Sequence, residues 1–124
     1  MLKRRILSLF LLLALLLPTA SAANGSAARD GIRGVWVSSV YNIDYPTRQG
    51  MTADELKSEA DAILDNIASM GLNTVFLQVR PSADALYQSD LFPWSRYVSG
   101  TTGQAPDGGL DLLAYWVNGA HSRG

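Results

Sequence analysis

The sequence predicts an α/β fold with parallel strands, because three segments of the right kind follow one another along the chain. Residues 34–41 and 74–80 are rich in β-branched and aromatic side chains, as strands are. Between them, residues 52–70 carry apolar side chains at spacings of three and four, the pattern of an amphipathic helix. A strand, a helix and a strand joined by short connections form a right-handed unit whose two strands run parallel.

The predicted helix at residues 52–70 carries sequence signals at both of its ends. Thr52 and Glu55 have the spacing of a capping box, and Asp54 adds a second acidic side chain to the first turn. Gly71 stands where a helix commonly stops. One face of this helix is therefore expected to pack on the strands while the other faces water.

A long loop and a second helix follow the second strand. The loop at residues 82–109 mixes polar and aromatic side chains, and loops of this length more often carry function than not. Residues 110–123 are predicted to be helical, with Trp116 packing against a neighbour that this chain does not contain. We expect Trp36, midway along the first strand, to lie in the core. The expected apolar stripe of the second helix consists of Leu110, Leu113, Ala114, Val117 and His121.

Residues 1–22 have the order of a secretory signal peptide, with basic side chains first and a small-residue cleavage site last. The apolar run between them, residues 6–17, spans 12 residues, whereas a membrane-spanning helix needs roughly 20. Residues 23–31 are predicted to be a linker, and residues 32–124 a folded domain. We therefore expect export by a cleavable signal peptide to the periplasm, the cell envelope or the medium.

Composition argues against several classes of protein. After residue 22 the chain has seven basic and eleven acidic side chains, a net charge of −4 without a basic stripe, so nucleic acid is not an expected partner. The chain has no cysteine, and His121 is its single histidine, so we expect no metal site. No glycine-rich phosphate loop follows either strand, and no cofactor is expected. The oligomeric state stays open.

Three stretches of the chain resemble the exported glycosyl hydrolase-like family 10. They are residues 33–46 (RGVWVSSVYNIDYP), 71–103 (GLNTVFLQVRPSADALYQSDLFPWSRYVSGTTG) and 111–124 (DLLAYWVNGAHSRG). The resemblance implies a TIM (β/α)8 barrel in a bacterial, exported protein. It also implies hydrolysis of O-glycosyl bonds in envelope or extracellular polysaccharides, peptidoglycan glycan among them.

The resemblance further implies that this chain supplies only part of such a barrel. A complete barrel needs about 250 residues, and this chain matches its first two βα units: strand, helix, strand, long loop, helix. In glycosidases on such barrels the catalytic carboxylates usually follow later strands. We therefore expect a truncated and inactive N-terminal portion. The alternatives are a non-catalytic glycan-binding module and a non-functional gene fragment.

Ligands of a barrel bind at the carboxyl ends of its strands, and this rule selects the candidate site. Arg80, at the end of the second strand, would bind sugar hydroxyls or a substrate carboxylate, or would instead pair with Asp84 or with a catalytic carboxylate after a later strand. Asp44 and Asp84 are the two loop carboxylates near that end and thus the candidate catalytic pair. Alternatively, Asp44 caps a turn before Pro46, and Asp84 caps a helical turn at residues 85–87. The predicted substrate-binding residues are Asn42, Gln78, Arg80, Asp84, Tyr87 and Trp94.

Aromatic side chains in the same loops suggest contacts with pyranose rings, because a flat apolar ring with a polar tip suits a sugar face. The candidates are Tyr41, Tyr87, Trp94 and Tyr97. Trp94, in the Pro93-Trp94-Ser95 sequence, is the strongest of these. The alternative is that Trp94 anchors the long loop to the rest of the domain.

Overall fold

The computed structural model describes residues 31–124. The predicted signal peptide, and all but the last residue of the predicted linker, lie outside the described residues. Two strands, β1 (Gly34–Val37) and β2 (Thr74–Leu77), pair in parallel, with Trp36 opposite Phe76. The parallel pairing confirms the sequence prediction. Within residues 31–124, none of the helices has the length and apolar character needed to cross a bilayer.

Helix α2 (Ala53–Ser69) connects the strands and begins as its sequence predicts. The Thr52 hydroxyl accepts from the Glu55 backbone N–H, and the Glu55 carboxylate accepts from the Thr52 N–H at 2.8 Å, which completes the capping box. Gly71 follows the helix with a φ of +72°, a conformation that glycine adopts without the penalty of a Cβ. Both predicted helix ends are confirmed.

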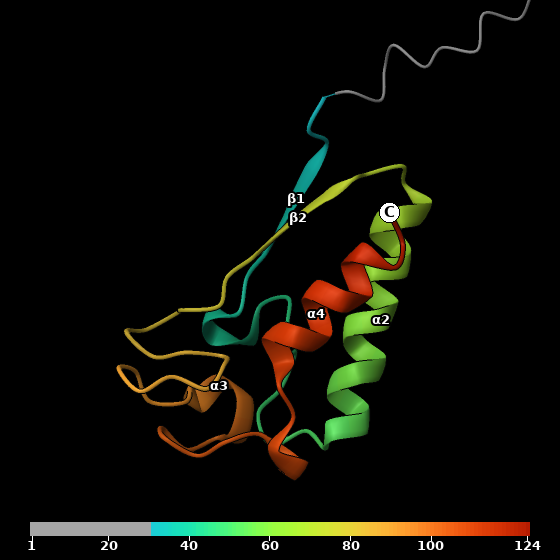
Figure 1. Ribbon diagram of the computed structural model, residues 1–124. Helices are drawn as coiled ribbons and strands as arrows, with labels where there is room; N and C mark the ends of the chain where they lie inside the picture. Colours follow the sequence, from blue (N-terminus) through green and yellow to red (C-terminus); the bar gives the residue numbers. More distant parts are fainter. Residues whose placement is uncertain (1–30) are drawn as a thin grey trace, which may run out of the picture. The chain divides into compact units, whose positions relative to one another are not determined.

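Helix α4 (Leu112–His121) lies beside α2, and both helices lie on the same side of the strands (Figure 1). Its Asp111 cap accepts from the Ala114 N–H at 2.9 Å. The predicted stripe is wrong, because the buried side chains are Leu112 and Trp116, and Val117 is 42% exposed. Nearly every residue from 112 to 117 is apolar, so spacing alone does not distinguish the buried face from its neighbour.

The core lies between the helices and the inner face of the strands. It includes Val37, Tyr45, Leu56, Ala60, Leu64, Leu86, Val98, Leu112 and Trp116. Trp116 is 2% exposed, so its predicted packing against an outside neighbour is wrong: its partner is Tyr45 of the same domain. The indole fills the space that the loop after β1 leaves against α4.

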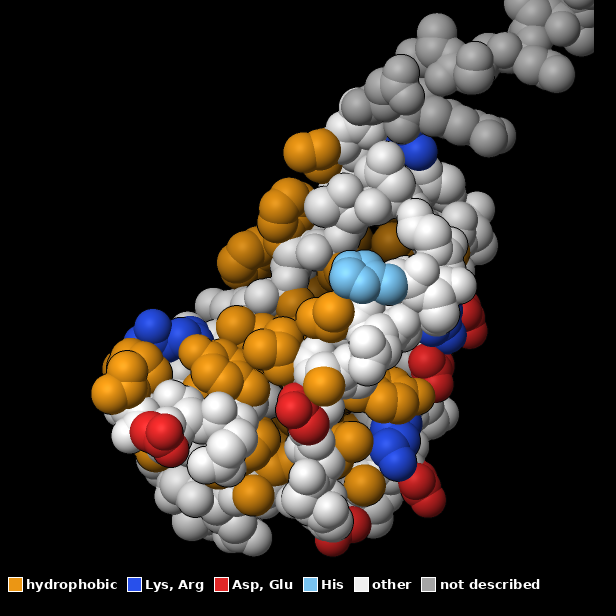
Figure 2. Space-filling view, viewed as in Figure 1, with side chains coloured by type: hydrophobic (Ala, Val, Ile, Leu, Met, Phe, Trp, Pro, Cys, Tyr) orange, Lys and Arg blue, Asp and Glu red, His pale blue; other side chains and the backbone are white. Residues whose placement is uncertain are grey.

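The opposite face of the strands is exposed, and no helix of residues 31–124 covers it. Trp36 is 59% exposed and Phe76 48%, so the predicted core position of Trp36 is wrong in this structure. Side chains alternate along a strand, and Trp36 points away from the helices that bury Val37. Figure 2 shows hydrophobic side chains along the strands on the side away from α2 and α4.

Both strands are shorter than predicted. Residues 38–41 and 78–80 do not continue the strand pairing. The Gln78 side-chain oxygen accepts from the Ser39 and Val40 N–H groups, which are then not available to extend the parallel hydrogen-bond pattern. A short 3-10 helix, Val40–Asn42, replaces the end of the first predicted strand. In the long loop lie α3 (Arg96–Ser99) and a second 3-10 turn, Asp107–Gly109.

Candidate functional site

The loops that follow β1 and β2 meet at one end of the sheet, together with α3 (Figure 1). This is the carboxyl end of both parallel strands, where the sequence places the candidate site. Three non-glycine residues among those described have positive φ angles: Tyr41, Asn42 and Ala83. All three lie in these two loops. Such conformations are uncommon for non-glycine residues and concentrate at functional sites.

Gln78 binds the loop after β1 rather than projecting freely from its strand. Its side-chain oxygen accepts from the Ser38 hydroxyl, the Ser39 N–H and the Val40 N–H, each at 3.0 Å. The Ser39 hydroxyl in turn donates to the Gln78 carbonyl at 2.5 Å. Because the oxygen has three donors, the part of this side chain left for a ligand is its amide N–H2 group.

Asn42 joins the two loops to each other. Its side-chain amide donates to the Pro46 carbonyl at 2.6 Å and to the Tyr97 carbonyl at 2.7 Å. Both amide hydrogens are therefore engaged within the protein. Among its side-chain atoms, the amide oxygen is the group that Asn42 can offer to a substrate.

The two candidate carboxylates have different surroundings. Asp44 is exposed, and one of its oxygens accepts from the Ser38 N–H at 2.7 Å, which closes a turn before Pro46. Asp84 is 4% exposed and accepts from the Ser82 N–H at 2.9 Å. Each carboxylate thus has a bond within its own loop, as the turn-capping alternative requires for Asp44.

The loop after β2 is held by backbone pairing rather than by a helical turn at residues 85–87. Ala85 donates to the Pro93 carbonyl at 2.9 Å and accepts from the Ser95 N–H at 2.7 Å. Leu86 donates to the Val79 carbonyl at 2.9 Å. The predicted helical turn is therefore wrong, because Ala85 forms a bridge with Trp94 instead.

Arg80 does not pair with Asp84. Within residues 31–124 the ion pairs of arginine and lysine side chains involve Arg48, Lys57 and Arg123. The Arg80 guanidinium lies 3.5 Å from the centroid of the Phe92 ring, a cation–π contact. Arg80 is exposed, so the contact with Phe92 holds its charge at the surface.

The four aromatic candidates differ in exposure. Trp94 is 9% exposed, and its indole N–H donates to the Gln88 side-chain oxygen at 3.3 Å, so it anchors the loop. Tyr97 is 3% exposed and Tyr87 is partly buried. Tyr41 is 75% exposed. A sugar ring could therefore reach the Tyr41 side chain and not the flat face of Trp94.

Electrostatic contacts connect α3 to the loops. A hydrogen bond with the Arg96 guanidinium, assisted by the Ser82 hydroxyl, lowers the pKa of Tyr97 below its usual range. The same contact raises the pKa of Arg96. Arg96 was not among the residues predicted from the sequence, although an arginine directly before Tyr97 in an aromatic loop is a signal that could have identified it.

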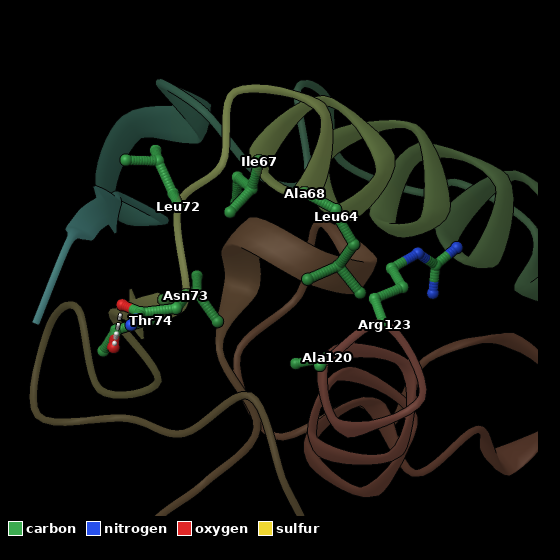
Figure 3. Close-up of a pocket in the computed structure, with 10 residues that line it drawn as sticks. Leu64, Ile67, Ala68, Leu72, Asn73, Thr74, Ala120 and Arg123 are labelled. Atoms are coloured by element: carbon green, nitrogen blue, oxygen red, sulfur yellow. Dashed lines mark hydrogen bonds between the residues drawn. The ribbon is translucent and has the colours of Figure 1, made fainter. Parts of the chain in front are cut away.

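A small cavity lies away from the candidate site, between α2, α4 and the start of β2. It measures about 40 Å³ and is bordered by the ends of α2 and α4 and by Asn73 and Thr74 at the start of β2 (Figure 3). Leu64, Ile67, Leu72 and Ala120 make its lining largely apolar. It lies at the amino end of β2, opposite the candidate site, and brings together none of the predicted site residues. No group of three or more His, Asp or Glu side chains in residues 31–124 is placed to hold a metal ion.

Comparison with known proteins identifies a family and several curated relatives. The family model described as Glycosyl hydrolase-like 10 matches residues 31–124. Glycosyl hydrolase YngK of Bacillus subtilis is 42% identical over 101 residues, which cover 82% of this chain and 19% of that protein. Glycosyl hydrolase DigH of Escherichia coli K12 is 34% identical over 100 residues, or 75% of this chain and 22% of that protein. The chain thus spans about a fifth of the length of these curated relatives.

Proposed function

Because this chain belongs to the glycosyl hydrolase-like 10 family, we propose that it is the N-terminal portion of an exported glycoside hydrolase-like protein. Its substrate is an envelope or extracellular polysaccharide, with peptidoglycan glycan as one candidate. The family match over residues 31–124 is the observation that carries the proposal. The predicted signal peptide at residues 1–22 supports export.

The arrangement of the loops supports glycan binding at the carboxyl end of the strands. Asn42 and Gln78 fix the loops after β1 and β2 in one surface, and Arg80 adds an exposed cation that no carboxylate among residues 31–124 neutralises. Sugar hydroxyls need donors and acceptors at fixed positions, and these loops provide both. Asp84, Tyr87 and Trp94 complete the proposed surface, with Trp94 acting chiefly as its support.

The fold that we propose for the whole protein is a (β/α)8 barrel, of which this chain forms two βα units. The bare face of the strands supports it, because the inner face of a barrel strand packs against the other strands. Trp36 and Phe76 would then lie in the barrel interior. The opposite face of the strands carries α2 and α4, as the outer face of a barrel carries its helices.

The chemistry that we propose assigns hydrolysis to carboxylates outside this chain. Glycoside hydrolysis uses two carboxyl groups, one of which donates a proton to the leaving oxygen. Asp44 and Asp84 already accept backbone hydrogen bonds within their loops, and this supports a role in loop structure. The chain by itself therefore binds glycan without cleaving it.

An assay with defined glycans tests the proposal. The chain is incubated with purified peptidoglycan glycan strands and with a soluble β-glucan, and both retardation in affinity electrophoresis and release of reducing ends are measured. Retardation by at least one glycan without new reducing ends is the expected result. Release of reducing ends would show that the chain is active alone, whereas no retardation by any envelope or extracellular glycan would contradict glycan binding.

A further inference from the structure

Tyr41 combines an exposed ring with a backbone that is costly to form. Its side chain is 75% exposed, whereas that of Tyr45 in the same loop is fully buried. Its φ of +54° lies in the left-handed region, which bulky residues seldom occupy. Neither property helps the domain to fold. A residue that is both strained and exposed is a candidate for a role in binding.

The surroundings of Tyr41 hold its ring in one place. The Tyr97 ring packs against it with centroids 5.9 Å apart and an interplanar angle of 65°. On one side Gln78 accepts from the Val40 N–H at 3.0 Å, and on the other Asn42 donates to the Tyr97 carbonyl at 2.7 Å. The residues before and after Tyr41 are thus bonded to the second loop, so the ring is ordered before any ligand arrives.

A cation lies against the other ring of this pair. The Arg96 guanidinium lies 5.3 Å from the centroid of the Tyr97 ring, and the Arg96 side chain is exposed. No carboxylate among residues 31–124 forms an ion pair with it. The Tyr41 hydroxyl contributes to the raised pKa of Arg96, after the larger contribution of Tyr97, which is consistent with Tyr41 and Arg96 lying in the same patch.

We infer that Tyr41 and Arg96 form a subsite for one pyranose ring. The C–H face of the sugar packs on the Tyr41 ring, and its ring-edge hydroxyls accept hydrogen bonds from Arg96. Aromatic rings suit this face because it is apolar and flat, while a guanidinium presents several donors in one plane. The inference rests on the proposed function and adds the residues that would contact a sugar.

The test uses substitutions matched to the backbone of position 41. Tyr41→Asn removes the ring but keeps a residue that tolerates positive φ, and Tyr41→Trp keeps a stacking surface. Leu91→Asn is the matched control, because Leu91 is 83% exposed and lies in the same group of loops. Binding of the full chain to hexa-N-acetylchitohexaose and to cellohexaose is measured by isothermal titration calorimetry.

For whichever oligosaccharide the unchanged chain binds, Tyr41→Asn is expected to weaken the affinity about tenfold or more, the equivalent of losing one stacking contact. Tyr41→Trp and Leu91→Asn should stay within about threefold of the unchanged chain. Arg96→Gln should also weaken binding. Equal affinity of the Tyr41→Asn and unchanged chains would overturn the inference and leave the proposed function intact. No binding by the unchanged chain would contradict both.

A second measurement covers the case in which Tyr41→Asn fails to fold. The ring protons of Tyr41 are assigned in the unchanged chain by comparison with Tyr41→Phe, and the oligosaccharide is titrated in. Upfield shifts of the sugar C–H protons, together with movement of the Tyr41 ring signals, support stacking. Tyr41 ring signals that do not move as the sugar saturates its site would overturn the inference.

Discussion

The ring of Tyr45 packs edge to face against the indole of Trp116, with their centroids 4.8 Å apart and their planes at 75°. Tyr45 belongs to the loop after β1, and its hydroxyl also donates to the Leu56 carbonyl of α2 at 3.2 Å. One side chain therefore fastens the candidate site to both helices. The position of the loop after β1 depends on this contact.

Replacing Trp116 tests how much this contact stabilises the domain. Trp116→Ala should lower the free energy of unfolding by about 3–5 kcal/mol, because it removes a large buried side chain and leaves a cavity. Urea denaturation followed by circular dichroism measures the change. Val117→Ala is the control: its side chain is 42% exposed, and its effect should be about 1 kcal/mol or less. Equal effects of the two substitutions would contradict the buried position of Trp116.

Burial of Tyr45 predicts a loss of stability in alkaline solution. Burial raises the pKa of Tyr45 above the ordinary value of 10.0, so the folded chain keeps this proton where the unfolded chain loses it. The contribution is fully present below about pH 10 and is lost as the pH rises above that value. Urea midpoints between pH 8 and pH 11 should fall less steeply for Tyr45→Phe than for the unchanged chain.

Other tyrosines also affect how the urea midpoint changes with pH. The quantity to compare is therefore the difference in midpoint between Tyr45→Phe and the unchanged chain. The Asp61 carboxylate raises the pKa of Tyr115, whereas Arg96 lowers that of Tyr97. Tyr87→Phe serves as the control, because the Tyr87 side chain is not buried in the core. Parallel curves for Tyr45→Phe and Tyr87→Phe would show that Tyr45 ionises as an exposed tyrosine does.

Gln78 should control the order of the loop after β1. Gln78→Ala leaves the Ser39 and Val40 N–H groups without the acceptor that they share, at a cost of about 1–3 kcal/mol. Hydrogen exchange at these two amides should accelerate by tenfold or more, in line with that cost. Gln88→Ala is the matched control, since within residues 31–124 the Gln88 side-chain oxygen accepts one hydrogen bond, from the Trp94 indole. Unchanged exchange at Ser39 and Val40 would refute the role of Gln78.

The export proposal predicts a defined mature N-terminus. Cleavage after Ala22 would give a product that begins at Ala23. N-terminal sequencing of the protein recovered from the envelope or the medium identifies the first residue. Recovery of an uncleaved chain that starts at Met1 would contradict a cleavable signal peptide. Lys3→Glu combined with Arg4→Glu should retain the precursor inside the cell, because it reverses the charge of the basic segment.

The sequence was most informative where short-range chemistry determines the structure. The capping box at Thr52 and Glu55 and the stop at Gly71 involve residues a few positions apart, and all of them are confirmed. The parallel pairing of the strands follows from the connecting helix in the same way. These features need no knowledge of distant contacts.

The sequence was less informative where a distant side chain competes with a local pattern. Residues 38–41 have the composition of a strand, but Gln78, forty positions away, binds their backbone and turns them into a loop. Trp116 could not be assigned to the core from spacing, because its neighbours along α4 are equally apolar. Its burial depends on Tyr45, which lies in an irregular loop.

For the candidate site too, the sequence predicted the location but not the role of each residue. The carboxyl-end rule identified the two loops, and Gln78, Arg80 and Asp84 do lie there. The roles within the loops depend on backbone angles and on exposure, which composition does not report. Trp94 was the strongest stacking candidate in the sequence, yet its side chain is 9% exposed and that of Tyr41 is 75% exposed.

A titration of the isotopically labelled chain tests most directly whether the loops after β1 and β2 bind glycan. Backbone amide signals are followed by ¹H–¹⁵N correlation spectra while hexa-N-acetylchitohexaose, and then purified peptidoglycan glycan strands, are added. We predict that the shifts concentrate in residues 38–46 and 80–98, with the start of β2 at Asn73 and Thr74 unaffected. Shifts concentrated at Asn73, Thr74 and the end of α4, or no shifts with either glycan, would contradict the account.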